Sequence, residues 1–145
     1  MPMIDVYAAT GTFSDRHQLA RDLAAAVMRW EQVPDLALFR NNTAAFVHEM
    51  PPEAISNVVG GSHYVRVQVL TPVGVLNRAK QLGVVAELTE IVASAAGDAG
   101  LKARTWVLLT ESPEGGWGLA GHAHTGDDLA QAARAEIATA AAKPE

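Results

Sequence analysis

Pro2 stands between the initiator methionine and an apolar, strand-like segment, residues 3–9 (MIDVYAA). Proline cannot donate a hydrogen bond to a sheet ladder, so the first residue of a strand is one of the few places in a sheet that accept it. A structural role is therefore one interpretation of Pro2. The other starts from removal of Met1, which a small residue at the second position generally permits. Pro2 then presents a free secondary amine, and such an amine is both a base and a nucleophile.

An amine of this kind transfers protons when its surroundings adjust its pKa. A free α-amino group has a reference pKa of about 8, and desolvation disfavours its protonated form. Packed among apolar side chains and near a cation, the Pro2 nitrogen is expected to have a pKa close to neutrality, where a general base is most useful. Such a base removes a proton alpha to a carbonyl group and returns it elsewhere, which is keto–enol isomerisation. An amine that stays protonated acts as a general acid instead.

The other patterns that could carry chemistry are weak. His122 and His124 alternate in a strand-like segment, so both imidazoles are expected on one face, but with no third ligand nearby we predict no metal site. Gly115, Gly116 and Gly118 lie in a hairpin rather than between a strand and a helix, which excludes a phosphate-binding loop. We expect no cofactor. The absence of cysteine excludes disulfides, thiol catalysis and cysteine-bound metal.

Length and composition are those of an ordinary globular domain. The 145 residues suffice for one domain with a genuine core, and the formal net charge is −5. No block of lysine and arginine stands out, so nucleic acid is not an expected partner. The apolar runs fall short of the about 18–20 residues that span a bilayer, and the N-terminus does not have the pattern of a signal peptide, so no membrane is expected. We predict a cytoplasmic protein.

Apolar periodicity predicts strands and helices in alternation. Strands are expected at residues 3–9, 44–49, 63–70 and 105–110. Two long helices are expected to begin at the N-caps Ser14 and Asn77, and an alanine-rich helix at residues 127–142 to end the chain. The long helices are each expected to bury one stripe: Leu19, Leu23, Val27 and Trp30 in the first, and Leu82, Val85, Leu88, Val92 and Ala96 in the second.

The strand–helix–strand pattern occurs twice, and each copy has a glutamate, Glu49 or Glu111, followed by Pro-Glu and a glycine-rich close. We divide this single compact domain into two β-α-β units, residues 1–61 and 62–126, followed by a C-terminal helix and tail, residues 127–145. Strands within a unit are expected to be parallel, which gives an α/β fold: a four-stranded sheet with both helices on one face. The uncovered face is then expected to meet another copy of the chain.

The strand that opens on Pro2, the repeated β-α-β unit and the hairpin PEGGWGLAG (residues 113–121) together resemble the tautomerase superfamily. The superfamily includes 4-oxalocrotonate tautomerase. Its double-length members, such as malonate semialdehyde decarboxylase, cis-3-chloroacrylic acid dehalogenase and macrophage migration inhibitory factor, carry two fused units and assemble as trimers. The resemblance covers roughly residues 2–122. It implies a tautomerase-like fold, a homotrimer and a catalytic Pro2.

This sequence departs from the superfamily where its members generally supply arginines. One such arginine lies in the turn after the first strand of a unit, but residues 10–12 and 71–75 contain no basic residue. Another lies early in the second strand of a unit, where this chain has Ala44 and Trp106. Without these carboxylate-binding groups, diacid and haloacrylate substrates become doubtful. A more apolar aryl or alkyl carbonyl compound is expected.

Three further residues are expected to bind the substrate. Trp117 falls in the hairpin where relatives place an aromatic or acidic site residue, and it either lines the pocket or packs the hairpin onto a neighbouring subunit. Arg40, in the polar segment FRNNT, is the best remaining cation that could reach the pocket rim. The alternative interpretation is that Arg40 is a solvent-exposed loop residue without a role in the site. Trp106 lies in the middle of an apolar strand. The alternative interpretation is that it packs in the core or in an interface rather than in the site.

The sequence thus predicts a tautomerase-like isomerase that uses Pro2 as general base on a small, fairly apolar carbonyl compound. Two alternatives stay open. One is a hydratase or decarboxylase of a small keto or unsaturated acid, with Pro2 as general acid. The other is a non-catalytic trimeric binding protein, in which Met1 is retained.

Overall fold

The computed structural model describes residues 1–143 and places four strands in one mixed sheet. Their order is β2-β1-β3-β4, formed by β1 (Met3–Ala9), β2 (Ala44–Met50), β3 (Val65–Pro72) and β4 (Thr105–Ser112). β1 runs parallel to β2, β3 runs parallel to β4, and the two central strands are antiparallel. Each β-α-β unit contributes one parallel pair, so the predicted architecture is confirmed.

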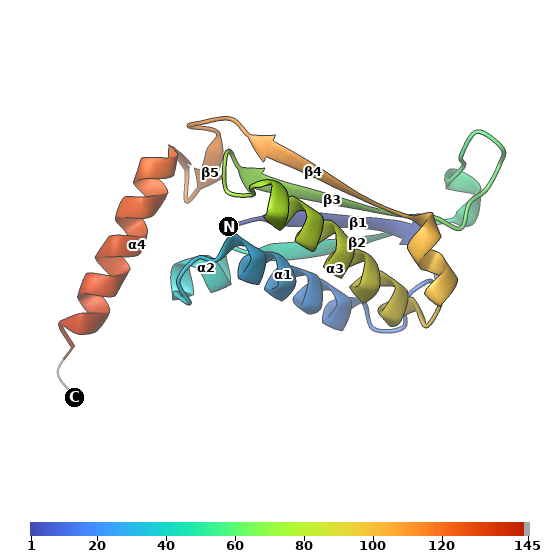
Figure 1. The fold of residues 1–145 in the computed structure, drawn as a ribbon, viewed down its shortest axis with the longest axis horizontal. Coiled ribbons are helices and arrows are strands. Elements are labelled where there is room, and N and C mark those ends of the chain that lie inside the picture. Colours follow the sequence, from blue (N-terminus) through green and yellow to red (C-terminus); the bar gives the residue numbers. More distant parts are fainter. Residues whose placement is uncertain (144–145) are drawn as a thin grey trace.

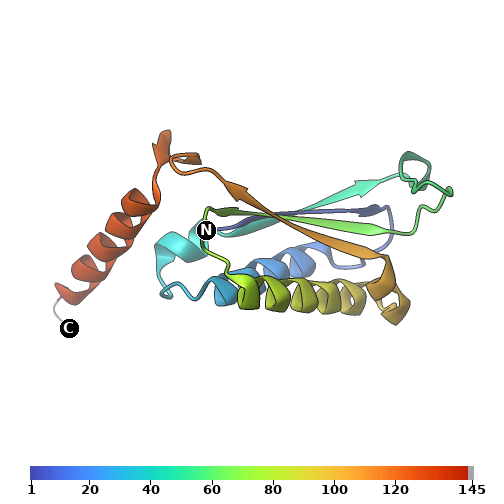
Figure 2. The same ribbon diagram turned by 45° about the horizontal axis from the view of Figure 1, so that its top comes forward.

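Two long helices, α1 (Arg16–Glu31) and α3 (Arg78–Ala96), cover one face of the sheet and lie beneath it in Figure 2. The core forms between these layers because alternate residues of the central strands face the helices. Those on β1 and β3 are fully or almost fully buried: Ile4, Val6, Ala8, Val65, Val67 and Val69. The four-residue series Leu19, Leu23 and Val27 is buried on α1, as predicted.

The caps explain where the two helices begin. Asn77 caps α3, as expected, because its side chain accepts a hydrogen bond from the Lys80 amide. At α1 the prediction was wrong by one residue. Asp15 rather than Ser14 is the N-cap, and its carboxylate accepts from the Gln18 amide.

The predicted stripe of α3 was wrong at Leu82, which is 55% exposed. The buried residues of this helix are Val84, Leu88, Val92 and Ala93. At about 100° per residue, Leu82 points about 120° away from Leu88, whereas Val84 lies one turn before it on the same side. The four-residue series through Leu88 therefore defines the face that meets the sheet.

The remaining elements are short except for the last helix, which projects from one end of the sheet in Figure 1. They are α2 (Ala37–Asn41), η1 (Pro52–Ala54), η2 (Ala99–Arg104), β5 (Trp117–Leu119), β6 (His122–His124) and α4 (Gly126–Ala141). β5 and β6 form the predicted hairpin, and the last helix begins within one residue of its predicted start. The last residues of the predicted tail, 144–145, lie outside the described part of the chain. Within residues 1–143, no helix is both long and apolar enough to cross a bilayer.

The second face of the sheet is open and carries large apolar side chains. Phe46 on β2 is 52% exposed, and Trp106 on β4 is 46% exposed. Trp106 stacks on Tyr64, with ring centroids 4.7 Å apart, and Leu70 and Leu108 are also exposed. A face of this composition is typical of an interface between subunits.

Candidate functional site

The beginning of the chain is buried beside a carboxylate. The ammonium nitrogen of Met1 lies 2.9 Å from Oε2 of Glu31, and both side chains are almost completely inaccessible. Pro2, which follows, is buried as well and leads directly into β1. The Pro2 carbonyl accepts a hydrogen bond from the Ala44 amide at 3.3 Å, which extends the pairing of β1 with β2 toward the chain end.

Glu31 is the last residue of α1, and the backbone reverses immediately after it. Gln32 adopts a left-handed conformation, with φ 57°, and its amide donates to the Arg29 carbonyl. Glu31 itself is 5% exposed, and its Oε1 atom is buried without a hydrogen-bond partner among the described residues. A buried carboxylate oxygen without a partner is costly and rare, so this atom marks a place where a polar group from outside the chain would be stabilised.

A cavity of about 260 Å³ lies against Met1 and Glu31. Its walls come from widely separated parts of the sequence. The region of α2 contributes Val33 and Phe39, and the segment before α3 contributes Pro72, Val73 and Val75. The hairpin contributes Trp117 and His124, and α4 contributes Leu129. Phe39 and Trp117 are buried in a second apolar cluster that also contains Met1. The turn before α3 contains no basic residue and forms an apolar wall of the cavity.

The charge at this cavity is negative rather than positive. Among residues 1–143 no lysine or arginine lines it, whereas Glu31 and Glu114 both do. The side chain of Glu114 is held by the Gly126 amide, which donates to Oε1 at 2.6 Å. The Lys80 ammonium donates to the main-chain oxygen of Glu31 at 3.2 Å from outside the cavity wall. The cation expected next to Pro2 is thus replaced by a carboxylate.

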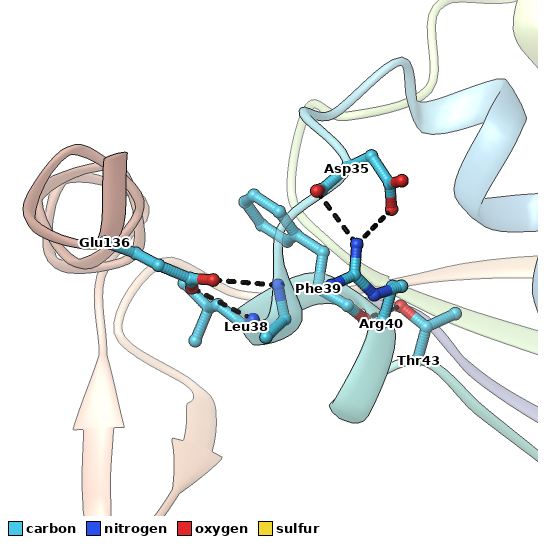
Figure 3. A network of polar contacts seen from close by, with 7 residues as sticks. Asp35, Leu38, Phe39, Arg40, Thr43 and Glu136 are labelled. Atoms are coloured by element: carbon cyan, nitrogen blue, oxygen red, sulfur yellow. Dashed lines mark hydrogen bonds and ion pairs between the residues drawn. The ribbon is translucent and has the colours of Figure 1, made fainter. Parts of the chain in front are cut away.

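Figure 3 shows how α4 is fixed against α2, which forms one wall of the cavity. The carboxylate of Glu136 accepts hydrogen bonds from the Ala37 amide at 2.8 Å and the Leu38 amide at 3.0 Å. These are unpaired N–H groups at the beginning of a helix, which favour a negative charge. The contact joins residues far apart in the chain and holds Phe39 in place beside the cavity.

The structure brings one of the four predicted site residues, Trp117, into the lining of this cavity, where it is 7% exposed. Pro2 does not line the cavity itself but follows Met1, which does. Arg40 does not line it: the guanidinium donates to the main-chain oxygen of Asp35 and to its Oδ1, at 2.9 and 2.6 Å, on the outer surface (Figure 3). Trp106 lies on the open face of the sheet.

Glu31 was not among the predicted site residues, although the sequence contains a signal for it. Glu31 continues the four-residue series of Leu19, Leu23 and Val27, and therefore lies on the buried side of α1. A carboxylate at the end of an apolar stripe is an unusual placement, because burying an unpaired charge is strongly unfavourable. Its position in the series is therefore enough to make such a residue a candidate for a functional role.

His122 and His124 have a third group close to them after all. One ligand atom from each, and one from Asp128, lie within 4.8 Å of one another. Asp128 also has a structural role, because it forms a capping box with Thr125 at the start of α4. Hydrogen bonds from Thr125, first from its backbone amide, hold the pKa of Asp128 below its usual value. The carboxylate is therefore already engaged in stabilising the helix.

No known protein family and no curated protein matches the sequence. Solved structures do share its fold. A fused 4-OT, described as a wild-type asymmetric trimer, has a TM-score of 0.69 at 21% identity, over 88% of this chain and 98% of that one. Pt0534 inactivated by 2-oxo-3-pentynoate has a TM-score of 0.72 at 17% identity, over 86% and 96%. N1, a member of the cis-3-chloroacrylic acid dehalogenase family, has a TM-score of 0.69 at 15% identity, over 98% and 92%.

Proposed function

We propose that this chain, which has the tautomerase-superfamily fold, is a keto–enol isomerase whose Pro2 amine transfers protons on a small, fairly apolar carbonyl compound. The observation that carries the proposal is that Pro2 is buried just before β1 and follows Met1, which lines a cavity walled by Phe39 and Trp117. Pockets that bind small molecules are typically apolar with a few placed polar groups. The fused 4-OT, Pt0534 and N1 structures support this assignment through the fold they share with this chain.

Removal of Met1 is part of the proposal because it creates both the amine and the space. Met1 lines the cavity and is 3% exposed, so its loss enlarges a volume of about 260 Å³ toward the about 300–1,000 Å³ of typical ligand sites. The Pro2 nitrogen, an amide nitrogen in the full chain, becomes a secondary amine at the cavity edge. The proline ring fixes φ, so this nitrogen is held with little conformational freedom.

The isomerisation requires the amine to act in both directions. As a base, the neutral Pro2 amine removes a proton alpha to the carbonyl group, and the resulting ammonium returns it to carbon or oxygen elsewhere in the substrate. The aromatic and aliphatic walls lower the local dielectric constant, which strengthens the electrostatic interactions between the amine and the developing enolate. The missing arginines favour a substrate without a free carboxylate.

A trimer is part of the same proposal. The open sheet face carries Phe46, Leu70, Trp106 and Leu108, and a second copy of this chain is the partner that would bury them. The fused 4-OT structures are described as trimers. In such an assembly Trp106 is an interface residue rather than a substrate-binding residue.

Two measurements test the proposed activity. Intact mass spectrometry should show the loss of Met1, and ultraviolet absorbance should show enzyme-dependent conversion of the enol of phenylpyruvate or of its methyl ester. Pro2→Ala should then lower the rate by at least about 10²-fold, because it replaces the secondary amine held by the proline ring with a primary amine that is free to rotate. Pro52→Ala, at an exposed proline, is the matched control and should leave the rate unchanged. An unchanged rate in Pro2→Ala would remove Pro2 from the mechanism, and retention of Met1 would favour the non-catalytic binding protein.

The buried Glu31 gives one alternative specific support. A carboxylate beside an amine favours the protonated form of that amine. Pro2 as a general acid is what hydration or decarboxylation of a small keto or unsaturated acid requires. Product analysis by NMR distinguishes the two activities, because hydration adds water and decarboxylation releases carbon dioxide, whereas isomerisation conserves the formula.

A further inference from the structure

We infer that Glu31 is a second catalytic group, which exchanges a proton with the oxygen of the substrate while Pro2 exchanges one with its carbon, and which excludes substrates carrying a free carboxylate. The inference rests on the proposed function and identifies both the partner of Pro2 and the charge class of the substrate.

The geometry places Glu31 within reach of both Pro2 and the substrate. The Met1 nitrogen lies 2.9 Å from Oε2 of Glu31. Only the Cα and the carbonyl carbon of Met1 separate that nitrogen from the nitrogen of Pro2, so the two nitrogens are within about 4 Å of each other. When Met1 is removed, the carboxylate loses its only ion-pair partner among the described residues. The Pro2 nitrogen is then an amine near this carboxylate, and the cavity that Met1 lined borders Glu31.

The unsatisfied oxygen of Glu31 provides the acceptor that isomerisation needs. Oε1 is buried and accepts no hydrogen bond from residues 1–143. The hydroxyl of a bound enol would satisfy it, and the hydrogen bond would be strong because the acceptor is charged and water is excluded.

The proton transfers balance without any cofactor. In ketonisation the enol O–H proton moves to the Glu31 carboxylate, and the oxygen electron pair forms the C=O bond. The electrons of the C=C bond take a proton from the Pro2 ammonium and form the C–H bond. The site then holds a neutral amine and a neutral carboxylic acid, and transfer of the proton from Glu31 to Pro2 restores the starting state. Enolisation follows the same steps in reverse.

The charges around Glu31 explain the exclusion of carboxylate substrates. Glu114 lines the same cavity, and His124 lines it with Nε2 3.2 Å from the Leu119 carbonyl. Apart from the Met1 ammonium, Lys80 is the one cation with a hydrogen bond to Glu31 among the described residues, and it donates only to the main-chain oxygen. A substrate carboxylate would thus face the buried carboxylate of Glu31 and the exposed carboxylate of Glu114. Like charges at such distances disfavour binding strongly.

The experiment compares a matched pair of substrates, phenylpyruvate and its methyl ester, in protein whose mass shows that Met1 is absent. The wild type should prefer the ester by at least about tenfold in kcat/KM, since the two differ in charge at one position. Glu31→Gln should lower kcat for the ester by about 10²-fold and reduce the preference for the ester, because it removes both the proton acceptor and the charge. Glu53→Gln, at an exposed glutamate, should change neither value.

A second readout does not depend on turnover. NMR titration of the Pro2 nitrogen should show its midpoint falling by about one pH unit in Glu31→Gln, because a neutral amide no longer favours the ammonium. Glu31→Asp keeps the charge, so its titration midpoint and its preference for the ester should stay close to those of the wild type. This variant keeps the test informative if Glu31→Gln does not fold. An unchanged midpoint and an unchanged preference, with Pro2→Ala inactive, would overturn the role of Glu31 and leave the proposed function standing. Full activity of Pro2→Ala would overturn the proposed function itself.

Discussion

Gly83 of α3 packs tightly against the Trp30 ring of α1, and Gly83→Ala is expected to destabilise the fold. A Cβ atom at Gly83 would overlap three ring carbons of Trp30 on the neighbouring helix. The indole is not free to move away, because Nε1 donates to Oε2 of Glu87 and Arg29 binds the other oxygen of the same carboxylate at 2.7 Å. The added methyl group therefore either strains the packing or breaks the Trp30–Glu87 hydrogen bond.

The magnitudes determine the sign of this effect. Alanine is the better helix former by about 0.8–1.0 kcal/mol, which favours the variant. Overpacking costs about 1–3 kcal/mol, and a lost hydrogen bond to a charged group costs about 1.5–3 kcal/mol. Relaxation follows the cheaper of these routes, so after the gain in helix propensity the free energy of unfolding should fall by up to about 2 kcal/mol.

A double-mutant cycle in urea tests this reasoning. Unfolding is measured at one fixed protein concentration, since association makes the apparent stability concentration-dependent. In a Trp30→Ala background the ring that the new methyl group would overlap is absent. Gly83→Ala should then stabilise the protein by about 0.5–1 kcal/mol. The same effect in both backgrounds, or a stabilised single variant, would refute the proposed contact.

Two other predictions concern assembly and acid stability. Trp106→Asp on the open sheet face should reduce the mass found by light scattering to that of a monomer without changing the far-ultraviolet circular dichroism; a monomeric wild type would refute the predicted trimer. The pKa of Glu87 is lowered, chiefly by its hydrogen bond from Arg29. A carboxyl whose pKa is lowered by folding stabilises the folded state at pH values above its unfolded-state pKa of about 4.3. That stabilisation is lost as the pH falls through the lower pKa of the folded state. Glu87→Gln should therefore flatten the acid limb of stability measured from pH 6 to 3; an unchanged slope would contradict the assignment.

Local patterns were sufficient to predict the strands, the long helices and their order. The alternation around Val6 and Val67 is a property of short segments and specifies which face of these strands is buried, and the cap at Asn77 specifies where α3 begins. The error at Leu82 arose because α3 contains apolar residues on more than one side, so its sequence does not define a single phase.

The site was harder to predict because contacts between distant residues create it. Helix α2 was expected only as a polar segment, and its first amides are satisfied by Glu136, which lies far away in the sequence. Nothing in the sequence around Arg40 indicates that its guanidinium is engaged. In the folded chain it forms an ion pair with Asp35. The pairing of Glu31 with the chain end joins residues that no sequence motif connects.

The enclosed position of the first residue has a practical consequence for anyone who produces this protein. On the proposed mechanism, an affinity tag fused ahead of Pro2 would keep its nitrogen in an amide bond, and the added chain would have to leave through a space already filled by Met1. Such material would fold and yet be inactive, and it would be mistaken for a protein without activity. A tag on the opposite end, beyond the projecting α4, avoids the problem (Figure 1).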